Sequence, residues 1–89
     1  MAIHYLFFGK VQGVFFRAFV KKSALQLGVT GFARNLPDGS VEAVLQGKEI
    51  LVKRIVEKLR AGPPLSAVES VDAKEIKPPK KFSSFEILH

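Results

Sequence analysis

The sequence predicts an α+β fold in which two helices cover one face of an antiparallel sheet. Three observations lead to this prediction. Strand-like apolar runs alternate with two helical periodicities, a Pro-Asp-Gly turn joins two neighbouring runs, and a length of 89 residues suits one hydrophobic core. With 47% hydrophobic residues, eight Phe and no Cys, that core must be aromatic and aliphatic, without disulfides or thiolate metal sites. We therefore expect a single domain over residues 1–89.

The first half of the chain contains the patterns of three strands and a helix. Residues 3–8 form an apolar, aromatic-rich run of strand length that ends at Gly9. A helix is predicted from Phe16 onward, because four apolar residues recur every three or four positions. It is predicted to stop at Gly28, since glycine commonly follows the last turn of a helix. These are Phe16, Val20, Ala24 and Leu27. Residues 30–35 and 40–46 are predicted to form a hairpin about the turn at 36–39.

The second half adds a helix and two strands. The helix has Glu49 in its first turn and Gly62-Pro63-Pro64 after its last, with apolar residues at helical spacing between them. These are Leu51, Val52, Ile55, Val56 and Leu59. Residues 68–76 and 82–88 are predicted strands, joined by a basic loop at 77–81. The resulting order, βαββαβ with one more C-terminal strand, is that of a ferredoxin-like sandwich.

Charge and hydropathy limit the classes of function. A net charge of +6 favours anionic partners, although it does not distinguish phosphorylated metabolites from nucleic acid or lipid head groups. No run approaches the roughly 20 apolar residues of a membrane span, and the first residues lack the basic region of a signal peptide. We expect a cytoplasmic protein that does not bind a membrane, and a monomer as the simplest state.

The connection between the first strand and the first helix predicts an anion site. Its sequence over residues 9–17 is GKVQGVFFR, and its two glycines permit backbone angles at which successive N–H groups converge. The helix start adds further N–H groups and the positive end of its dipole, and Arg17 adds a planar fork suited to phosphate. A plain tight connection would also explain these residues. The spacing does not fit a P-loop or a G-x-G-x-x-G dinucleotide site.

A second motif, GFARNLPDGSVEAVLQG over residues 31–47, contains Asn35 just before the turn. Taken alone, Asn35 could simply initiate the turn. Together, the segments at 9–17 and 31–47 resemble the two signatures of the acylphosphatase family, and the resemblance covers the whole chain. The one departure is Phe32, where members more often carry Trp, and this keeps an aromatic residue at the position.

The resemblance implies a metal-independent hydrolase that converts a small-molecule acyl phosphate into a carboxylate and inorganic phosphate, without a cofactor. It implies that Arg17 binds the phosphate and that Asn35 orients the attacking water. The backbone amides expected to hold the phosphate with Arg17 belong to Gln12, Gly13, Val14, Phe15, Phe16 and Arg17 itself. Because the leaving carboxylate has a conjugate acid of pKa about 4, little general-acid assistance is required. Nothing in the sequence specifies the acyl group.

The remaining titratable residues have no spacing typical of a catalytic or metal site. His4 lies inside the first predicted strand and His89 at the end of the chain, so both are expected to be ordinary core or surface residues. The carboxylates on predicted exposed faces are expected to be solvated. These are Glu42, Glu49, Asp72 and Glu75.

Two alternatives to a free-standing hydrolase would also suit a ferredoxin-like domain. Ferredoxin-like sheets also occur in nucleic-acid-binding modules, and the positive charge would suit that role. The aromatic motif of such modules, K/R-G-F/Y-G/A-F-V-x-F/Y, is absent, so we do not expect nucleic acid as a partner. A domain that handles carbamoyl phosphate inside a larger enzyme is less expected for a chain that ends at His89.

Overall fold

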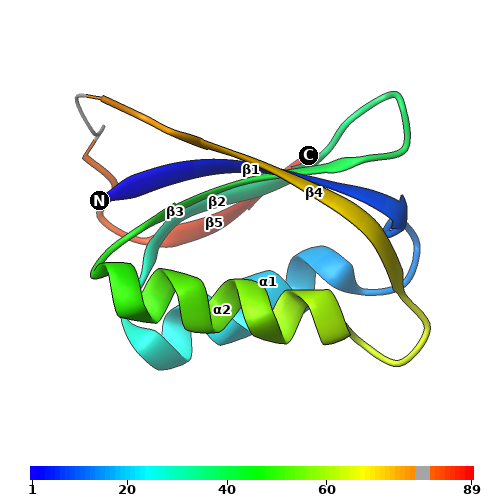
Figure 1. Ribbon diagram of the computed structural model, residues 1–89, viewed down its shortest axis with the longest axis horizontal. Helices are drawn as coiled ribbons and strands as arrows, with labels where there is room; N and C mark the ends of the chain where they lie inside the picture. The colour runs from blue at the N-terminus through cyan, green and yellow to red at the C-terminus, as the bar shows by residue number, and fades with distance from the viewer. Residues whose placement is uncertain (78–80) are drawn as a thin grey trace.

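The computed structural model describes residues 1–77 and 81–89 and has two layers, a five-stranded sheet with both helices packed on one face (Figure 1). The elements in chain order are β1 (Ala2–Lys10), α1 (Phe16–Leu27), β2 (Thr30–Asn35), β3 (Val41–Gln46), α2 (Glu49–Ala61), β4 (Ala67–Glu75) and β5 (Phe85–Leu88). The predicted α+β, ferredoxin-like architecture is confirmed. Both helices begin and end within one or two residues of their predicted bounds.

The sheet is mixed, which corrects the prediction that it is antiparallel. Its strand order is β4-β1-β3-β2-β5, and β5 pairs in parallel with β2 while the other pairs are antiparallel. The reason is topological, because β4 ends at the same end of the sheet at which β5 must start (Figure 1). The last strand also begins at Phe85, three residues later than predicted. Part of the predicted basic loop, residues 78–80, lies outside the described residues.

The core lies between the sheet and the helices and follows the predicted periodicities. Tyr5 and Phe7 of β1 alternate with half-buried neighbours, as expected for a strand with one face covered. The buried residues of the helices are Phe16, Val20, Ser23 and Ala24 in α1, and Val52, Ile55, Val56 and Leu59 in α2. Each fully buried apolar side chain contributes roughly 1.5–3 kcal/mol. This packing fixes the positions of α1 and β2, whose ends carry the predicted functional residues.

Gly31 is required by the close approach of β2 to β3. Its φ is 137°, and a Cβ at this position would lie 1.8 Å from the carbonyl oxygen of Val44. Any other residue would therefore displace the backbone of β3. Neither helix in the described ranges is long and apolar enough to span a membrane.

Candidate active site

The loop between β1 and α1 has the backbone pattern of an anion-binding nest. Gly13 has φ 72° and Phe15 has φ 62°, whereas Val14 between them has a negative φ. Such an alternation directs successive N–H groups toward one side of the chain. The buried side chains of Val14 and Phe16 anchor the loop to the core, while Phe15 is 80% exposed. A left-handed Phe costs about 1–2 kcal/mol, so the loop is held in this shape by its neighbours.

The backbone N–H groups of this loop are available to a ligand. No acceptor within residues 1–77 and 81–89 pairs with the N–H groups of residues 12–17, which include the first two of α1. The N-cap residue Phe15 offers no side-chain hydrogen bond, and the first turn of α1 contains no acidic residue. The positive end of the helix dipole is therefore not neutralised by a carboxylate of its own first turn.

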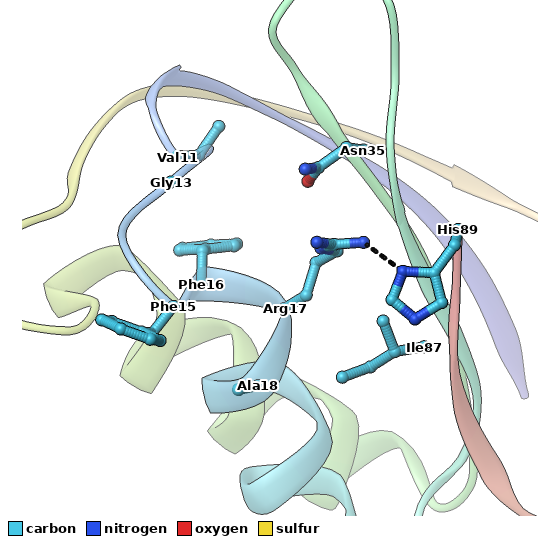
Figure 2. Close-up of a pocket in the computed structure, with 9 residues that line it drawn as sticks. All are labelled: Val11, Gly13, Phe15, Phe16, Arg17, Ala18, Asn35, Ile87 and His89. Carbon is cyan, nitrogen blue, oxygen red and sulfur yellow. Dashed lines mark hydrogen bonds between the residues drawn. The ribbon is translucent and has the colours of Figure 1, made fainter.

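A pocket of about 310 Å³ opens beside this loop (Figure 2). It is lined by Val11, Gly13, Phe15, Phe16, Arg17, Ala18, Asn35, Ile87 and His89. Five of the predicted site residues thus come together from the β1–α1 loop, from α1 and from β2. They are Gly13, Phe15, Phe16, Arg17 and Asn35. Gln12 and Val14 do not line the pocket. The side chain of Gln12 is turned toward the β2–β3 hairpin, and that of Val14 is buried in the core.

The guanidinium of Arg17 is held at one end only. Its Nη1 donates to the carbonyl oxygen of Leu88 at 3.3 Å and lies 3.4 Å from Nδ1 of His89. No partner for its Nε or Nη2 occurs in the described part of the chain. Figure 2 shows the guanidinium between the amide of Asn35 and the ring of His89. The fork formed by Nε and Nη2 is therefore available for two oxygens of an anion.

Asn35 is the last residue of β2, and strand alternation puts its side chain on the same face as the buried Ala33. Its Oδ1 is buried and accepts no hydrogen bond from the described residues. Leaving a buried carbonyl oxygen unpaired costs about 1–3 kcal/mol. A polar atom left in this state beside a pocket can accept a hydrogen bond from water or from a ligand.

Gln12 connects the loop to the hairpin that carries Asn35. Its Nε2 donates to the carbonyl oxygens of Leu36 at 2.8 Å and Ser40 at 2.9 Å. The turn between these residues closes as predicted, with Leu36 N donating to Ser40 O at 2.9 Å. Hydrogen bonds from Ser40 lower the pKa of Asp38. The bridging side chain of Gln12 was not predicted, because its partners are backbone atoms 24 and 28 residues away.

A second polar cluster lies on the outer face of the sheet. Glu42 accepts hydrogen bonds from Nε and Nη2 of Arg34 at 2.9 and 2.6 Å, and its other oxygen lies 2.8 Å from Nε2 of His4. The prediction that Glu42 is solvated was wrong, because cross-strand pairing leaves its side chain only 14% exposed. The other three carboxylates, Glu49, Asp72 and Glu75, are exposed as predicted.

His89 is exposed, as expected of a surface residue, but it also lines the pocket with Arg17. Spacing along the chain does not reveal this placement, since it depends on the parallel pairing of β5 with β2. Within the described residues, no group of three or more His, Cys, Asp or Glu side chains could hold a metal ion.

Comparisons with known proteins agree with the fold and with the family that the sequence resembles. The profile of the acylphosphatase family matches residues 3–87. An acylphosphatase of Marinobacter nauticus is 42% identical over 86 residues, which cover 97% of this chain and 94% of that protein. The crystal structure of the Bacillus subtilis acylphosphatase matches with a TM-score of 0.95 at 31% identity, covering 99% of this chain and 98% of that one. For an acylphosphatase structure from Coxiella burnetii the TM-score is 0.92 at 41% identity, with coverages of 98% and 90%. The chain therefore belongs to the acylphosphatase family and is an acyl phosphate hydrolase.

Proposed function

We propose that the pocket between Arg17 and Asn35 is the site at which this enzyme hydrolyses the carboxyl–phosphate bond. One observation carries the proposal. Nitrogen donors of Arg17 and of the loop at 12–17, which have no partners among the described residues, belong to a segment that borders the same pocket as Asn35, whose Oδ1 also lacks a partner there. The donors match the phosphate of the substrate, and the acceptor matches a hydrogen atom of water.

Phosphate binding is assigned to Arg17 and to the backbone N–H groups of residues 12–17. A phosphate dianion requires several donors at once, and the loop offers N–H groups that no acceptor in residues 1–77 or 81–89 occupies. The Nε and Nη2 atoms of Arg17 can contact two phosphate oxygens together, which fixes the orientation of the group as well as neutralising its charge. The net charge of +6 further favours the approach of an anionic substrate.

Water orientation is assigned to Asn35. Its Oδ1 can accept a hydrogen bond from water while its Nδ2 donates one, so the side-chain amide can direct a lone pair of the water toward phosphorus. Electrostatic repulsion between water and a dianion, and the entropy of in-line placement, are the main obstacles to this reaction. The donors around the phosphate reduce the first obstacle, and Asn35 reduces the second.

No general base is required in this scheme. The pocket lining contains no carboxylate side chain among the described residues, and the leaving carboxylate departs without protonation because its conjugate acid has a pKa of about 4. The proton of the attacking water can pass to an oxygen of the substrate's own phosphate. The chemistry assigned to the side chains is thus binding, charge stabilisation and orientation, without a metal or cofactor.

We further propose that the enzyme acts as a monomer in the cytoplasm, with inorganic phosphate as its released product. All the groups assigned to catalysis belong to one chain, which supports activity of the monomer. The absence of cysteine suits a reducing compartment. Light scattering of the eluted enzyme during size-exclusion chromatography tests the oligomeric state, and a stable dimer would contradict the proposal.

The direct test of the site is turnover of benzoyl phosphate in the presence of a chelator. We expect hydrolysis that is unaffected by the chelator and is inhibited competitively by inorganic phosphate. Saturating phosphate should also raise the melting temperature, because a ligand that binds only the folded state stabilises it. Hydrolysis at the background rate, with no thermal shift, would reject the proposed site.

A further inference from the structure

His89 adds a third polar group to the pocket, and the register of the sheet explains why. The parallel pairing of β2 with β5 puts Arg34 opposite Leu88, so that the next residues along the two strands, Asn35 and His89, are neighbours. Both side chains line the pocket. In Figure 2 the ring of His89 lies beside the guanidinium of Arg17, with Nδ1 as the nearest ring atom.

The contact between His89 and Arg17 has a defined direction. A guanidinium can only donate hydrogen bonds, so Nδ1 of His89 must accept one from Nη1 of Arg17, and the ring proton must then be on Nε2. The same Nη1 donates to the carbonyl oxygen of Leu88. Two acceptors at the end of β5 therefore hold one amino group of a long and otherwise flexible side chain.

This arrangement leaves the opposite edge of the guanidinium for the substrate. The two contacts use Nη1, whereas Nε and Nη2 have no partner in the part of the chain that the structure describes. Fixing Nη1 restricts rotation about the last torsions of Arg17, which reduces the entropy lost when the fork binds phosphate.

We propose that His89 is a positioning residue for Arg17. Its neutral imidazole accepts a hydrogen bond from Nη1 through Nδ1 and, together with the carbonyl of Leu88, aims the Nε and Nη2 edge at the phosphate. This inference rests on the proposed role of Arg17 in phosphate binding. His89 does not itself touch the reacting atoms in this scheme.

A matched pair of substitutions tests the acceptor. In His89→Asn, an oxygen takes the branch position of Nδ1, whereas His89→Leu has a similar side-chain skeleton and no acceptor. We expect His89→Leu to raise KM for benzoyl phosphate and Ki for inorganic phosphate about fivefold, the effect of one ordinary hydrogen bond, with kcat changed less than about twofold. His89→Asn should restore both constants to within about twofold of wild type. Equal behaviour of the two variants would overturn the proposal.

A double-mutant cycle with Arg17→Lys separates positioning from direct phosphate contact. Lysine has no Nη1, so adding His89→Leu to Arg17→Lys should have almost no further effect. A fivefold loss that persists in that background would mean that His89 binds phosphate itself. If Arg17→Lys weakens substrate binding and His89→Leu leaves KM and Ki unchanged, only the positioning role of His89 is rejected. Wild-type kinetics in Arg17→Lys would instead reject the proposed function of Arg17, and the positioning role with it.

Discussion

The two faces of the sheet each carry a small polar cluster, and the clusters differ in how completely they are hydrogen-bonded. On the outer face, the carboxylate of Glu42 is bound on both oxygens, by Arg34 and His4. On the face toward the helices, Asn35 Oδ1 and two nitrogens of Arg17 have no partner among the described residues. Arg34 and Asn35 are adjacent in β2, and strand alternation directs their side chains to opposite faces of the sheet. The hydrogen-bonded side chain of Arg34 is therefore on one face, and the unpaired oxygen of Asn35 is on the other.

This difference separates stability from function. Cross-strand ion pairs such as Arg34–Glu42 stabilise a sheet modestly, by up to about 1 kcal/mol. The unpaired oxygen of Asn35 costs stability, at about 1–3 kcal/mol for a buried carbonyl group. A ligand or water that pairs with this oxygen during function would offset that cost. Substitutions in the pocket should therefore reduce activity with little loss of stability, whereas substitutions in the outer cluster should reduce stability with little loss of activity.

The largest expected effect comes from comparing two arginines. Arg17→Ala removes both the fork and its charge from the pocket, and we expect kcat/KM for benzoyl phosphate to fall about a thousandfold, with the melting temperature little changed. Arg34→Ala is the matched control on the outer face. It should leave kcat/KM within about twofold of wild type and lower the free energy of unfolding by up to about 1 kcal/mol. Comparable losses of activity in both variants would show that charge in general matters, and not the position of Arg17.

The next effect separates binding from chemistry at Asn35. In Asn35→Ala we expect kcat to fall roughly a hundredfold or more, with the affinity for inorganic phosphate nearly unchanged, because the amide acts on water and not on the bound phosphate. Chemical denaturation should find a free energy of unfolding equal to that of wild type or higher, since an unpaired buried oxygen has been removed.

Two other outcomes for Asn35→Ala would each reject a part of this division of roles. If kcat is retained and phosphate binding is lost, Asn35 is a phosphate ligand. If the variant does not fold, Asn35 serves mainly to initiate the turn at 36–39, which was the alternative that its sequence context left open.

Local sequence patterns predicted the helices and the hairpin, and the family resemblance predicted the site residues. Helix bounds and the hairpin follow from local patterns, namely apolar spacing and the Pro37-Asp38-Gly39 turn, and these predictions are confirmed. The joining of Arg17 and Asn35 in one pocket agrees with the roles implied by the family resemblance. The roles themselves stay predictions.

What the sequence did not predict depends on contacts between distant segments. The burial of Glu42 requires the pairing of β3 with β1 and β2, which brings His4 and Arg34 to its two oxygens. The place of His89 requires the parallel pairing of β5, and a wholly antiparallel sheet would not bring it beside Asn35. Buried neighbours impose the left-handed conformation of Phe15, which a phenylalanine rarely adopts by its own preference.

An intermediate effect on activity is expected at Gln12, whose side chain is hydrogen-bonded within the protein, like the outer cluster, but lies next to the functional segments. Its side chain is satisfied by two backbone carbonyls, yet it links the loop of Arg17 to the hairpin of Asn35. Gln12→Ala should lower the free energy of unfolding by about 1–2 kcal/mol and reduce kcat/KM roughly tenfold, because small displacements between catalytic groups are costly. Denaturant titration and steady-state kinetics measure the two changes. Lost stability with full activity would mean that the link is structural only.

The smallest effect is the acid sensitivity of the outer cluster. Burial raises the pKa of Glu42, but the hydrogen bonds from His4 and Arg34 outweigh it, so the pKa lies below its usual value. A carboxylate whose pKa is lower in the folded than in the unfolded state stabilises the protein above the unfolded pKa, which is about 4.3. That stabilisation is lost as the pH falls through the folded pKa.

Glu42→Gln should therefore be less stable than wild type at pH 7, by about 1 kcal/mol, and the difference should shrink as the pH falls from about 5 toward 3. Urea titrations at several pH values measure this convergence. Glu57→Gln, at an exposed position on α2, provides the control and should run parallel to wild type. Activity at pH 7 should be equal in all three proteins, because the cluster lies on the face opposite the pocket. A constant stability gap between Glu42→Gln and wild type across this pH range would mean that the cluster stabilises by packing and not by charge.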